Sequence, residues 1–422
     1  MTLQLDEADR ALLQGARGPA MKLAMELVVQ AAQIMEAPRL IPVSFAHIDA
    51  CFYSGQAHID FVQYLLDHDA RFAVPSWSNN GVVSLTHFDL YDGNPDQEMV
   101  QGARKLMELY EALGCTPVWT CAPYHLPGRP RKGAHIVVGE SNAVTFYNSV
   151  AGCRTNKYGD YLDVACALVG KAPFAGLHTD EGRRAQLLFD LSDVAEEWRQ
   201  EDIFYHLLGH HVGRVSGRRI PVITGLPAKA NEDNLKAVSS AVAASGGVEL
   251  WHGVGVTPEA PDADAVFAGG PQHRVSHDDL KAARDVLTSG RDGPLDLVAF
   301  GTPHFSANEF ADVVKALDGR RISGNLSCVI TTSRFVRDYI AGKGWLAELE
   351  RAGVTVVADI CSYYTPGIRQ VRGRAMTNAA KWAYYAPGML PVEVCFGSLR
   401  ECVESAVRGE VWRDSRLWEA LA

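Results

Sequence analysis

The chain has 422 residues, of which 47% are hydrophobic and 21% charged, a composition typical of globular proteins with a large core. Its 40 basic and 50 acidic residues give a net charge of -10, which argues against non-specific binding to nucleic acid. No apolar run reaches the roughly 20 residues that a membrane helix needs, and residues 1–7 lack a signal-peptide pattern. We therefore expect a cytoplasmic protein of two or three domains.

Apolar residues with helical spacing predict helices between Glu7 and Ala37, interrupted at Gly15 and Gly18. Further along, short apolar runs predict buried strands that alternate with helices. The predicted strands are 40–45, 72–75, 116–120, 135–138, 220–223, 297–300, 328–331 and 354–358, and the predicted helices include 97–113, 143–150, 307–317 and 335–341. This alternation predicts an α/β fold with several parallel or mixed sheets flanked by helices.

The nine cysteines do not form a recognisable framework of disulfides or a zinc motif. Their number is odd and no C-x-x-C pair occurs. Most are expected to be small core residues. A metal site would therefore have to draw its cysteines from distant segments.

Polar residues follow several predicted strands, where ligands bind in parallel sheets. Cys121 follows the strand at 116–120, and Cys361 closely follows the strand at 354–358. Two thiolates from separate strand ends can converge on one iron or cluster. The alternative is two thiols packed in the core. Thr302 and His304 follow the strand at 297–300, and His47 and Asn80 follow the first two predicted strands.

A polar stripe precedes an arginine-containing loop. Ser141, Thr145 and Asn148 share one face of the helix predicted after the strand at 135–138, which lines a cavity or faces solvent. Ser141 could also serve only as a helix cap. Arg154, followed by Thr155 and Asn156 in a loop rich in glycine and asparagine, suits carboxylate binding. A solvated surface arginine is the equally simple interpretation.

Near the end of the chain, Thr377 and Lys381 are predicted to share a face at the start of a helix. Free amides and a lysine one turn on would form an anion site. A capped surface helix is the alternative. The run of small residues at 239–247 predicts a turn or a tight helix contact rather than a catalytic serine loop.

Taken together, the motifs resemble aconitase X, a branch of the aconitase superfamily. They occur in family order over nearly the whole chain: Trp119-Thr120-Cys121-Ala122-Pro123-Tyr124, Glu140-Ser141-Asn142-Ala143-Val144, Arg154-Thr155-Asn156, Ile220-Pro221-Val222-Ile223, Gly255-Val256-Thr257-Pro258-Glu259-Ala260, Pro303-His304, Asp359-Ile360-Cys361 and Phe396-Gly397-Ser398-Leu399. The resemblance implies an aconitase-like catalytic large unit over residues 1–422, divided approximately into 1–230 and 231–422.

The resemblance also implies a hydro-lyase that uses an iron–sulfur cluster or iron as a Lewis acid. The expected reaction converts cis-3-hydroxy-L-proline to Δ1-pyrroline-2-carboxylate, and the alternative substrate is mevalonate 5-phosphate. Aconitase-like enzymes hold their cluster through three cysteines, and Cys121 and Cys361 match two of these ligands. Thr302 stands where a third cysteine is expected. Cys153 or His304 could take its place.

The positions and chemistry of several other residues lead us to expect the following roles. His47 and Lys381 are the candidate catalytic residues, and the candidate substrate-binding residues are Asn80, Ser141, Asn142, Asn148, Arg154, Thr155, Asn156, Thr302, His304 and Thr377. The sequence contains no Gly/Ser-rich segment typical of the swivel domain, so we expect a separate small swivel subunit to supply the base.

Two rival interpretations come from other functional classes. Thr302 is compatible with a metal-free binding or scaffold protein that retained the fold. Cys121 could alternatively be a nucleophile, with His125 or His304 as its base.

Overall fold

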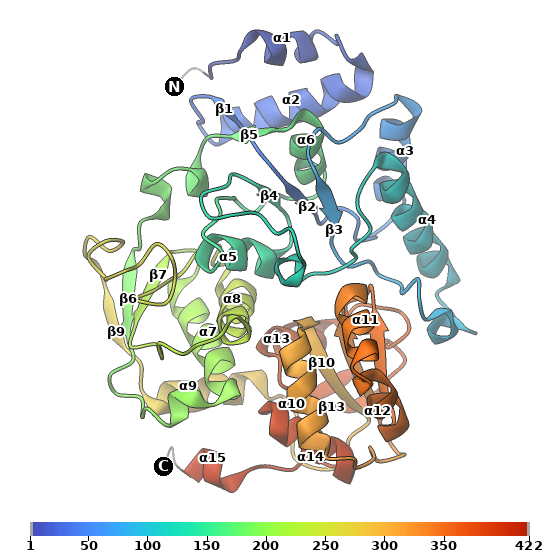
Figure 1. Cartoon of the computed structure of the whole chain (residues 1–422), viewed down its shortest axis with the longest axis vertical. Helices are drawn as coiled ribbons and strands as arrows, with labels where there is room; N and C mark the ends of the chain where they lie inside the picture. Colours follow the sequence, from blue (N-terminus) through green and yellow to red (C-terminus); the bar gives the residue numbers. More distant parts are fainter. Residues whose placement is uncertain (1–2, 420–422) are drawn as a thin grey trace.

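A computed structural model describes residues 3–419, and Figure 1 shows three groups of elements in chain order. The chain begins with helices α1 (Glu7–Leu13) and α2 (Gly18–Ile34), which confirms the predicted pair. Asp6 caps α1 through the amide of Asp9, and Pro19 starts α2, where its missing N–H costs nothing. The buried side of α2 packs against α6 (Leu162–Val169).

The first group contains a parallel sheet with the order β3-β2-β4. Its strands are β2 (Ala46–Ile48), β3 (Ser76–Ser78) and β4 (Val137–Val138), while β1 (Leu40–Pro42) and β5 (Lys171–Pro173) form a separate antiparallel pair. Helices α2, α3 (Gln56–Asp67), α4 (Gln97–Leu113) and α6 share one core with the sheet. On the opposite side, α5 (Ser141–Ser149) packs against Phe45 and Val138.

Three predicted strands in this group were misplaced. The structure puts the strand of residues 40–45 at 40–42 and 46–48, so His47 lies inside a strand, and the strand of 72–75 begins only at Ser76. The segment 116–120 is irregular, with a single bridge between Trp77 and Thr116. Pro117 cannot donate a ladder hydrogen bond, and Trp119 adopts a positive φ of 42°, so an extended strand cannot form there.

The second group is a four-stranded parallel sheet with the order β8-β7-β6-β9. Its strands are β6 (Leu187–Asp190), β7 (Pro221–Thr224), β8 (His252–Gly253) and β9 (Gln272–Arg274), and its helices are α7 (Asp202–Ser216), α8 (Glu232–Gly246) and α9 (His277–Leu287). The predicted tight helix contact is confirmed, because the run at 239–247 packs on α7 where Gly209 and Gly213 bring the two backbones together.

The third group is a five-stranded parallel sheet with the order β12-β11-β10-β13-β14. Its strands are β10 (Leu297–Phe305), β11 (Ser327–Thr332), β12 (Val354–Ala358), β13 (Gly373–Thr377) and β14 (Val392–Phe396). One face packs against α10 (Ala307–Leu317), α11 (Arg334–Gly342), α12 (Trp345–Ala352) and α14 (Leu399–Arg408), and the other against α13 (Ala380–Met389). The chain ends beyond α15 (Ser415–Glu419). Short 3-10 helices lie at Phe88–Tyr91, Pro123–His125, Gly176–His178, Glu181–Arg183 and Trp198–Gln200.

The three groups are joined by direct contacts. One hydrophobic core includes α7 and α8 of the second group together with Trp382 of α13. The loop after β3 meets the loop after β12, where the Gly81 amide donates to the Asp359 carbonyl at 2.7 Å. Within residues 3–419, no helix has both the length and the apolar character needed to cross a membrane.

Candidate active site

The two predicted metal-ligand thiols lie around one buried ion pair. Cys121 is in the loop before the 3-10 helix Pro123–His125, and its sulfur accepts the backbone N–H of His304 at 3.4 Å. Cys361 follows the end of β12. Burial raises the pKa of both thiols, Glu140 raises it further and Lys381 lowers it, and the Cys361 thiol also raises the pKa of Cys121. An irregular loop of the first group and the segment after β12 of the third group thus place both thiols within reach of the charges of one ion pair.

The ion pair joins α13 to α5. Lys381 lies in the first turn of α13 and binds the carboxylate of Glu140, the N-cap of α5, and its Nζ lies 3.2 Å from Ser141 Oγ. Burial opposes ionisation of Glu140, but Lys381 outweighs it and lowers the pKa of Glu140 to about 2. Burial would lower the pKa of Lys381, yet Glu140 raises it above its usual range. The site therefore contains one fixed cation and one fixed anion.

Glu140 was missed as a functional residue by the sequence analysis, although it directly precedes Ser141 at a strand end. Asn142 reinforces its position. The Asn142 amide nitrogen donates to Glu140 at 2.9 Å and to the Cys121 carbonyl at 3.0 Å, and its oxygen accepts from Tyr124 at 2.6 Å. The first turn of α5 thus fixes the Cys121 loop relative to the ion pair.

His47 and His304 are both neutral at neutral pH. Burial lowers the pKa of each ring to about 4. His304 uses both nitrogens, since Nε2 is 2.8 Å from the Ile360 carbonyl and Nδ1 is 2.9 Å from Thr120 Oγ1. His47 Nε2 donates to the Thr120 carbonyl at 2.9 Å, and its Nδ1 has no hydrogen-bond partner among residues 3–419. His47 therefore offers a free acceptor, whereas His304 is a structural bridge.

Four buried polar atoms within β2 and β10 and just after β3 and β13 lack partners in the described residues: His47 Nδ1, Thr302 Oγ1, Asn79 Oδ1 and Asn378 Oδ1. Buried polar side chains are normally paired, so such a set is typical of a site that receives a polar ligand. Two of the four, His47 and Thr302, were predicted. Asn79 and Asn378 were missed, although each is adjacent to a predicted residue.

The predicted geometry of Thr377 and Lys381 is wrong. Thr377 is the last residue of β13 and Lys381 lies in α13, so the two do not share a helix face. The Thr377 hydroxyl accepts the Ala379 amide at 3.1 Å and shapes the turn into α13. Asn80 is buried, and its amide nitrogen donates to the Gly81 carbonyl at 3.3 Å.

The predicted polar stripe of α5 links the first group to the second through hydrogen bonds. Thr145 Oγ1 donates to the Val248 carbonyl at 2.8 Å, and Asn148 Nδ2 donates to the Glu249 carbonyl at 3.0 Å. The stripe therefore reaches neither a cavity nor solvent at these two residues. Arg183 also donates to Asn148 Oδ1 at 3.0 Å, which makes Asn148 a junction between the groups.

The Arg154 loop has structural partners of its own. Arg154 pairs with the exposed Asp180, the Thr155 hydroxyl donates to the Asn156 carbonyl at 2.7 Å, and Asn156 Oδ1 accepts the Leu177 amide at 2.8 Å. None of the hydrogen bonds or ion pairs that these three side chains make within residues 3–419 involves the cysteines or the ion pair. Their role in binding substrate stays a prediction.

A cluster held by three cysteines needs three ligand side chains in one place. Within residues 3–419, no three His, Cys, Asp or Glu side chains are grouped to hold a metal ion. Cys153 lies elsewhere and donates to the Arg131 carbonyl at 3.4 Å, while Thr302 presents a buried, unpaired hydroxyl. A threonine hydroxyl is a poor iron ligand beside a thiolate. The residues fit a centre with two protein thiolates and do not fit a cluster held by three.

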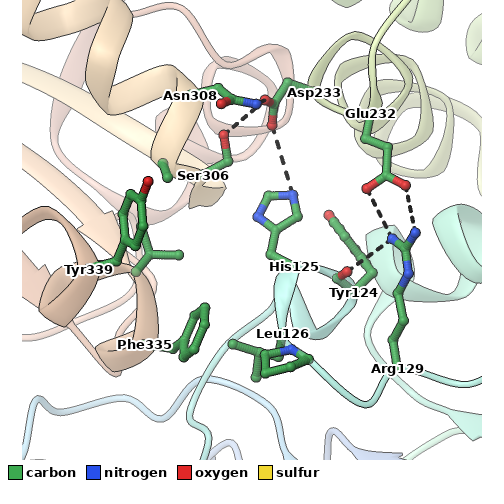
Figure 2. Close-up of a pocket in the computed structure, with 13 residues that line it drawn as sticks. Tyr124, His125, Leu126, Arg129, Glu232, Asp233, Ser306, Asn308, Phe335 and Tyr339 are labelled. Atoms are coloured by element: carbon green, nitrogen blue, oxygen red, sulfur yellow. Dashed lines mark hydrogen bonds and ion pairs between the residues drawn. The ribbon is translucent and has the colours of Figure 1, made fainter.

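A cavity of about 530 Å³ adjoins these loops where the three groups meet (Figure 2). Its wall includes His125, four residues after Cys121, and Ser306, two residues after His304. Figure 2 shows His125 pointing toward Asp233, and Glu232 paired with Arg129 at 2.7 Å. Phe335 and Tyr339 of α11 line the side of the cavity opposite Glu232 and Arg129. Glu232 and Arg129 of this cavity pair with each other, while Asp233 pairs with Lys236 at 3.2 Å.

Comparisons with known proteins agree with this geometry. Family models described as aconitase X first, second and third domain match residues 2–181, 185–285 and 295–408. The chain is 41% identical to cis-3-hydroxy-L-proline dehydratase of Pseudomonas aeruginosa, over 96% of this chain and 70% of that protein. The namesake protein of Hypocrea jecorina is 36% identical, over 97% and 69% respectively.

Relatives with another substrate in their name are more distant. The phosphomevalonate dehydratase large subunit of Methanocaldococcus jannaschii is 29% identical, over 95% of this chain and all of that protein. The crystal structure of Thermococcus kodakaraensis aconitase X in its holo-form superposes with a TM-score of 0.85 at 29% identity and covers 96% of this chain. The aconitase-like fold is thereby confirmed, and the chain belongs to the aconitase X family of hydro-lyases.

Proposed function

We propose that this chain is the catalytic unit of a dehydratase that acts on cis-3-hydroxy-L-proline and forms Δ1-pyrroline-2-carboxylate. The observation that carries the proposal is the buried Lys381–Glu140 pair, whose charges act on the thiols of Cys121 and Cys361. Four unpaired polar atoms within or just after β2, β3, β10 and β13 accompany it. The two relatives named for this substrate are 41% and 36% identical to the chain, against 29% for a relative named for phosphomevalonate.

The side chains support binding of a zwitterionic hydroxy acid. The Lys381 ammonium, with Ser141 Oγ 3.2 Å away, attracts the substrate carboxylate. Glu140 and the free acceptor His47 Nδ1 attract the ring ammonium. Thr302 and Asn378 offer further polar atoms to the hydroxyl. Because these groups come from separate elements, substrate binding would complete a network that the protein alone leaves open.

Cys121 and Cys361 would hold iron, alone or in a small cluster, as part of this proposal. Bound iron would supply a Lewis acid for the substrate oxygens. The base that removes the C2 proton would come from a small swivel subunit. The cytoplasmic location also remains a prediction.

The first experiment measures iron, sulfide and dehydration together. Protein is purified without oxygen, alone and with a swivel-type small subunit, and pyrroline-2-carboxylate formation is followed. We expect turnover of cis-3-hydroxy-L-proline and iron that is lost in Cys121→Ala and Cys361→Ala. Cys328→Ala is the matched control, because Cys328 is an equally buried thiol in the core of the third group.

Three results would contradict parts of this proposal. Turnover of mevalonate 5-phosphate with none of hydroxyproline would reassign the substrate. Iron retained in both cysteine variants would remove the thiols from the metal site. Absence of turnover of either compound, with and without the small subunit, would favour a binding or scaffold protein.

A further inference from the structure

A carboxyl group that the sequence analysis did not select lies beside the candidate site. Asp49 directly follows β2, as Glu140 follows β4 and Asn79 follows β3. Since the three strands are parallel neighbours, these residues share one edge of the sheet. Asp49 is only partly buried, whereas the His47 and Ile48 that precede it are fully buried. Asp49 therefore lies at the same sheet edge as Glu140 of the candidate site.

The position of Asp49 is held from three directions. Its Oδ1 accepts the Asn79 amide, and its backbone N–H donates to Asp163 Oδ2 at 2.7 Å. On the remaining side lies Gly139, where an added Cβ would collide with the Asp49 Cβ. Because residue 139 is a glycine, the Asp49 Cβ can lie close to the backbone that immediately precedes Glu140. With Oδ1 engaged by Asn79, Oδ2 is the oxygen left to carry a proton.

The surroundings favour the protonated acid. Burial raises the pKa of Asp49 well above its usual value, and the carboxylates of Glu140, Asp160 and Asp163 raise it further, while the Asn79 amide lowers it. The Lys381 ammonium is paired with Glu140. Asp49 consequently remains a neutral donor at a pH where ordinary aspartates are ionised.

We propose that the Asp49 carboxyl gives the substrate hydroxyl the proton with which it leaves as water, an inference that rests on the proposed dehydratase function. A base takes the C2 proton, and the C2–H electron pair forms the C2=C3 bond. The C3–O bond breaks with its pair on oxygen, which receives the proton from Asp49 Oδ2. The product tautomerises to the imine, and solvent reprotonates Asp49.

The substrate stereochemistry agrees with an acid placed on this chain. In cis-3-hydroxy-L-proline the hydroxyl lies on the same ring face as the carboxylate, so the C2 hydrogen lies on the opposite face. The acid and the base must therefore approach from opposite sides. A donor on β2 and a base on a separate subunit satisfy this requirement, because one side chain cannot serve both faces.

The test uses a leaving group that needs no proton. Asp49→Asn retains the shape of the side chain but cannot protonate hydroxide, whereas chloride departs from cis-3-chloro-L-proline unaided. In the active preparation we expect Asp49→Asn to lower kcat for hydroxyproline by about 10²–10⁴-fold, with KM little changed. Elimination of chloride should stay within about fivefold of the wild type, since the step then needs no general acid.

Two further variants serve as controls for this interpretation. Asp49→Glu restores a carboxyl and should recover part of the water elimination that Asp49→Asn loses. Asp160→Asn removes a partly exposed neighbouring carboxylate and should leave both reactions within about twofold of the wild type, because Asp160 only adds to the local negative charge.

The outcomes distinguish a failure of the role proposed for Asp49 from a failure of the proposed dehydratase function. If Asp49→Asn eliminates water as fast as the wild type, Asp49 is not the proton donor. The same conclusion follows if Asp49→Asn and Asp49→Glu both lose water elimination and chloride elimination to the same extent. If the wild type acts on neither compound, the dehydratase function itself is wrong and the role of Asp49 is lost with it.

Discussion

At the scale of residues, the Lys381–Glu140 pair is the most consequential contact of the site. The side chains are 5% and 14% exposed, so an unpaired partner would retain a charge without water. The pair also links the first group of elements to the third, because Glu140 caps α5 and Lys381 lies in the first turn of α13. Binding and stability are therefore coupled at this point.

We predict that Glu140→Gln lowers the free energy of unfolding by about 3–5 kcal/mol, because it leaves the Lys381 charge buried alone. The double variant Glu140→Gln/Lys381→Met should lose less than the single one. Glu232→Gln is the control, since its pair with Arg129 is 50% and 38% exposed and should contribute less than about 1 kcal/mol. Urea unfolding measures all three. Equal losses in the single variants Glu140→Gln and Glu232→Gln would refute the argument.

At the scale of elements, the α7–α8 contact shows how small residues position the site. Gly209 and Gly213 allow α7 to approach the backbone of α8, and α8 in turn packs against α5 and α13. These are the helices that carry Glu140 at the cap of α5 and Lys381 in α13. A displacement of α8 would therefore reach the ion pair.

We predict that Gly213→Ala destabilises the protein by about 1–3 kcal/mol through overpacking. Its Cβ would lie 2.9 Å from the Val242 carbonyl oxygen and still closer to Ser245 Oγ. Gly388→Ala in α13 is the matched helical control, since nothing lies within 4 Å of its added Cβ. That variant should gain about 0.4–1 kcal/mol from the reduced entropy of the unfolded chain. Thermal unfolding of both variants tests the contrast, which fails if Gly213→Ala is neutral.

At the scale of the whole molecule, buried neutral histidines recur in all three groups and their junctions. Burial is the main cause that lowers the pKa of six of them from 6.5 to about 3 or 4: His47, His125, His178, His206, His210 and His304. The unfolded chain would bind protons at these rings well before the folded protein does. Acid therefore favours unfolding.

We predict that the free energy of unfolding falls as the pH drops through 6.5 toward 4, because the folded pKa of each ring lies below its unfolded value. Burial acts oppositely on several carboxyls: it raises the pKa of Asp163 and Glu309 to about 7 and that of Asp202 to about 6, and it also raises the pKa of Asp49. The stabilising contribution of these carboxyls grows as the pH falls through those values. The six rings should outweigh these four carboxyls. Urea midpoints at about pH 7 and about pH 4.5 provide the measurement, and a higher midpoint in acid would contradict it.

The sequence by itself determined the elements whose signals are local. The helices at 97–113 and 307–317 and the strand at 354–358 have the bounds predicted from periodicity. The order of motifs also indicated the family. The element bounds were predictable because caps and periodicity depend on neighbouring residues. The expectation for Cys121 rested on a strand at 116–120 where the structure has an irregular segment, so a shared role of Cys121 and Cys361 as metal ligands stays a prediction.

Only the tertiary structure decided which polar residues belong to the site. Glu140 and Lys381 are 241 positions apart, and no local pattern pairs them. Likewise, the polar stripe of α5 could not reveal that Val248 and Glu249 would supply its acceptors. A side chain's role depends on what the fold places opposite it, and long-range packing sets that partner. Periodicity identifies the face of an element, but the neighbouring elements determine what that face contacts.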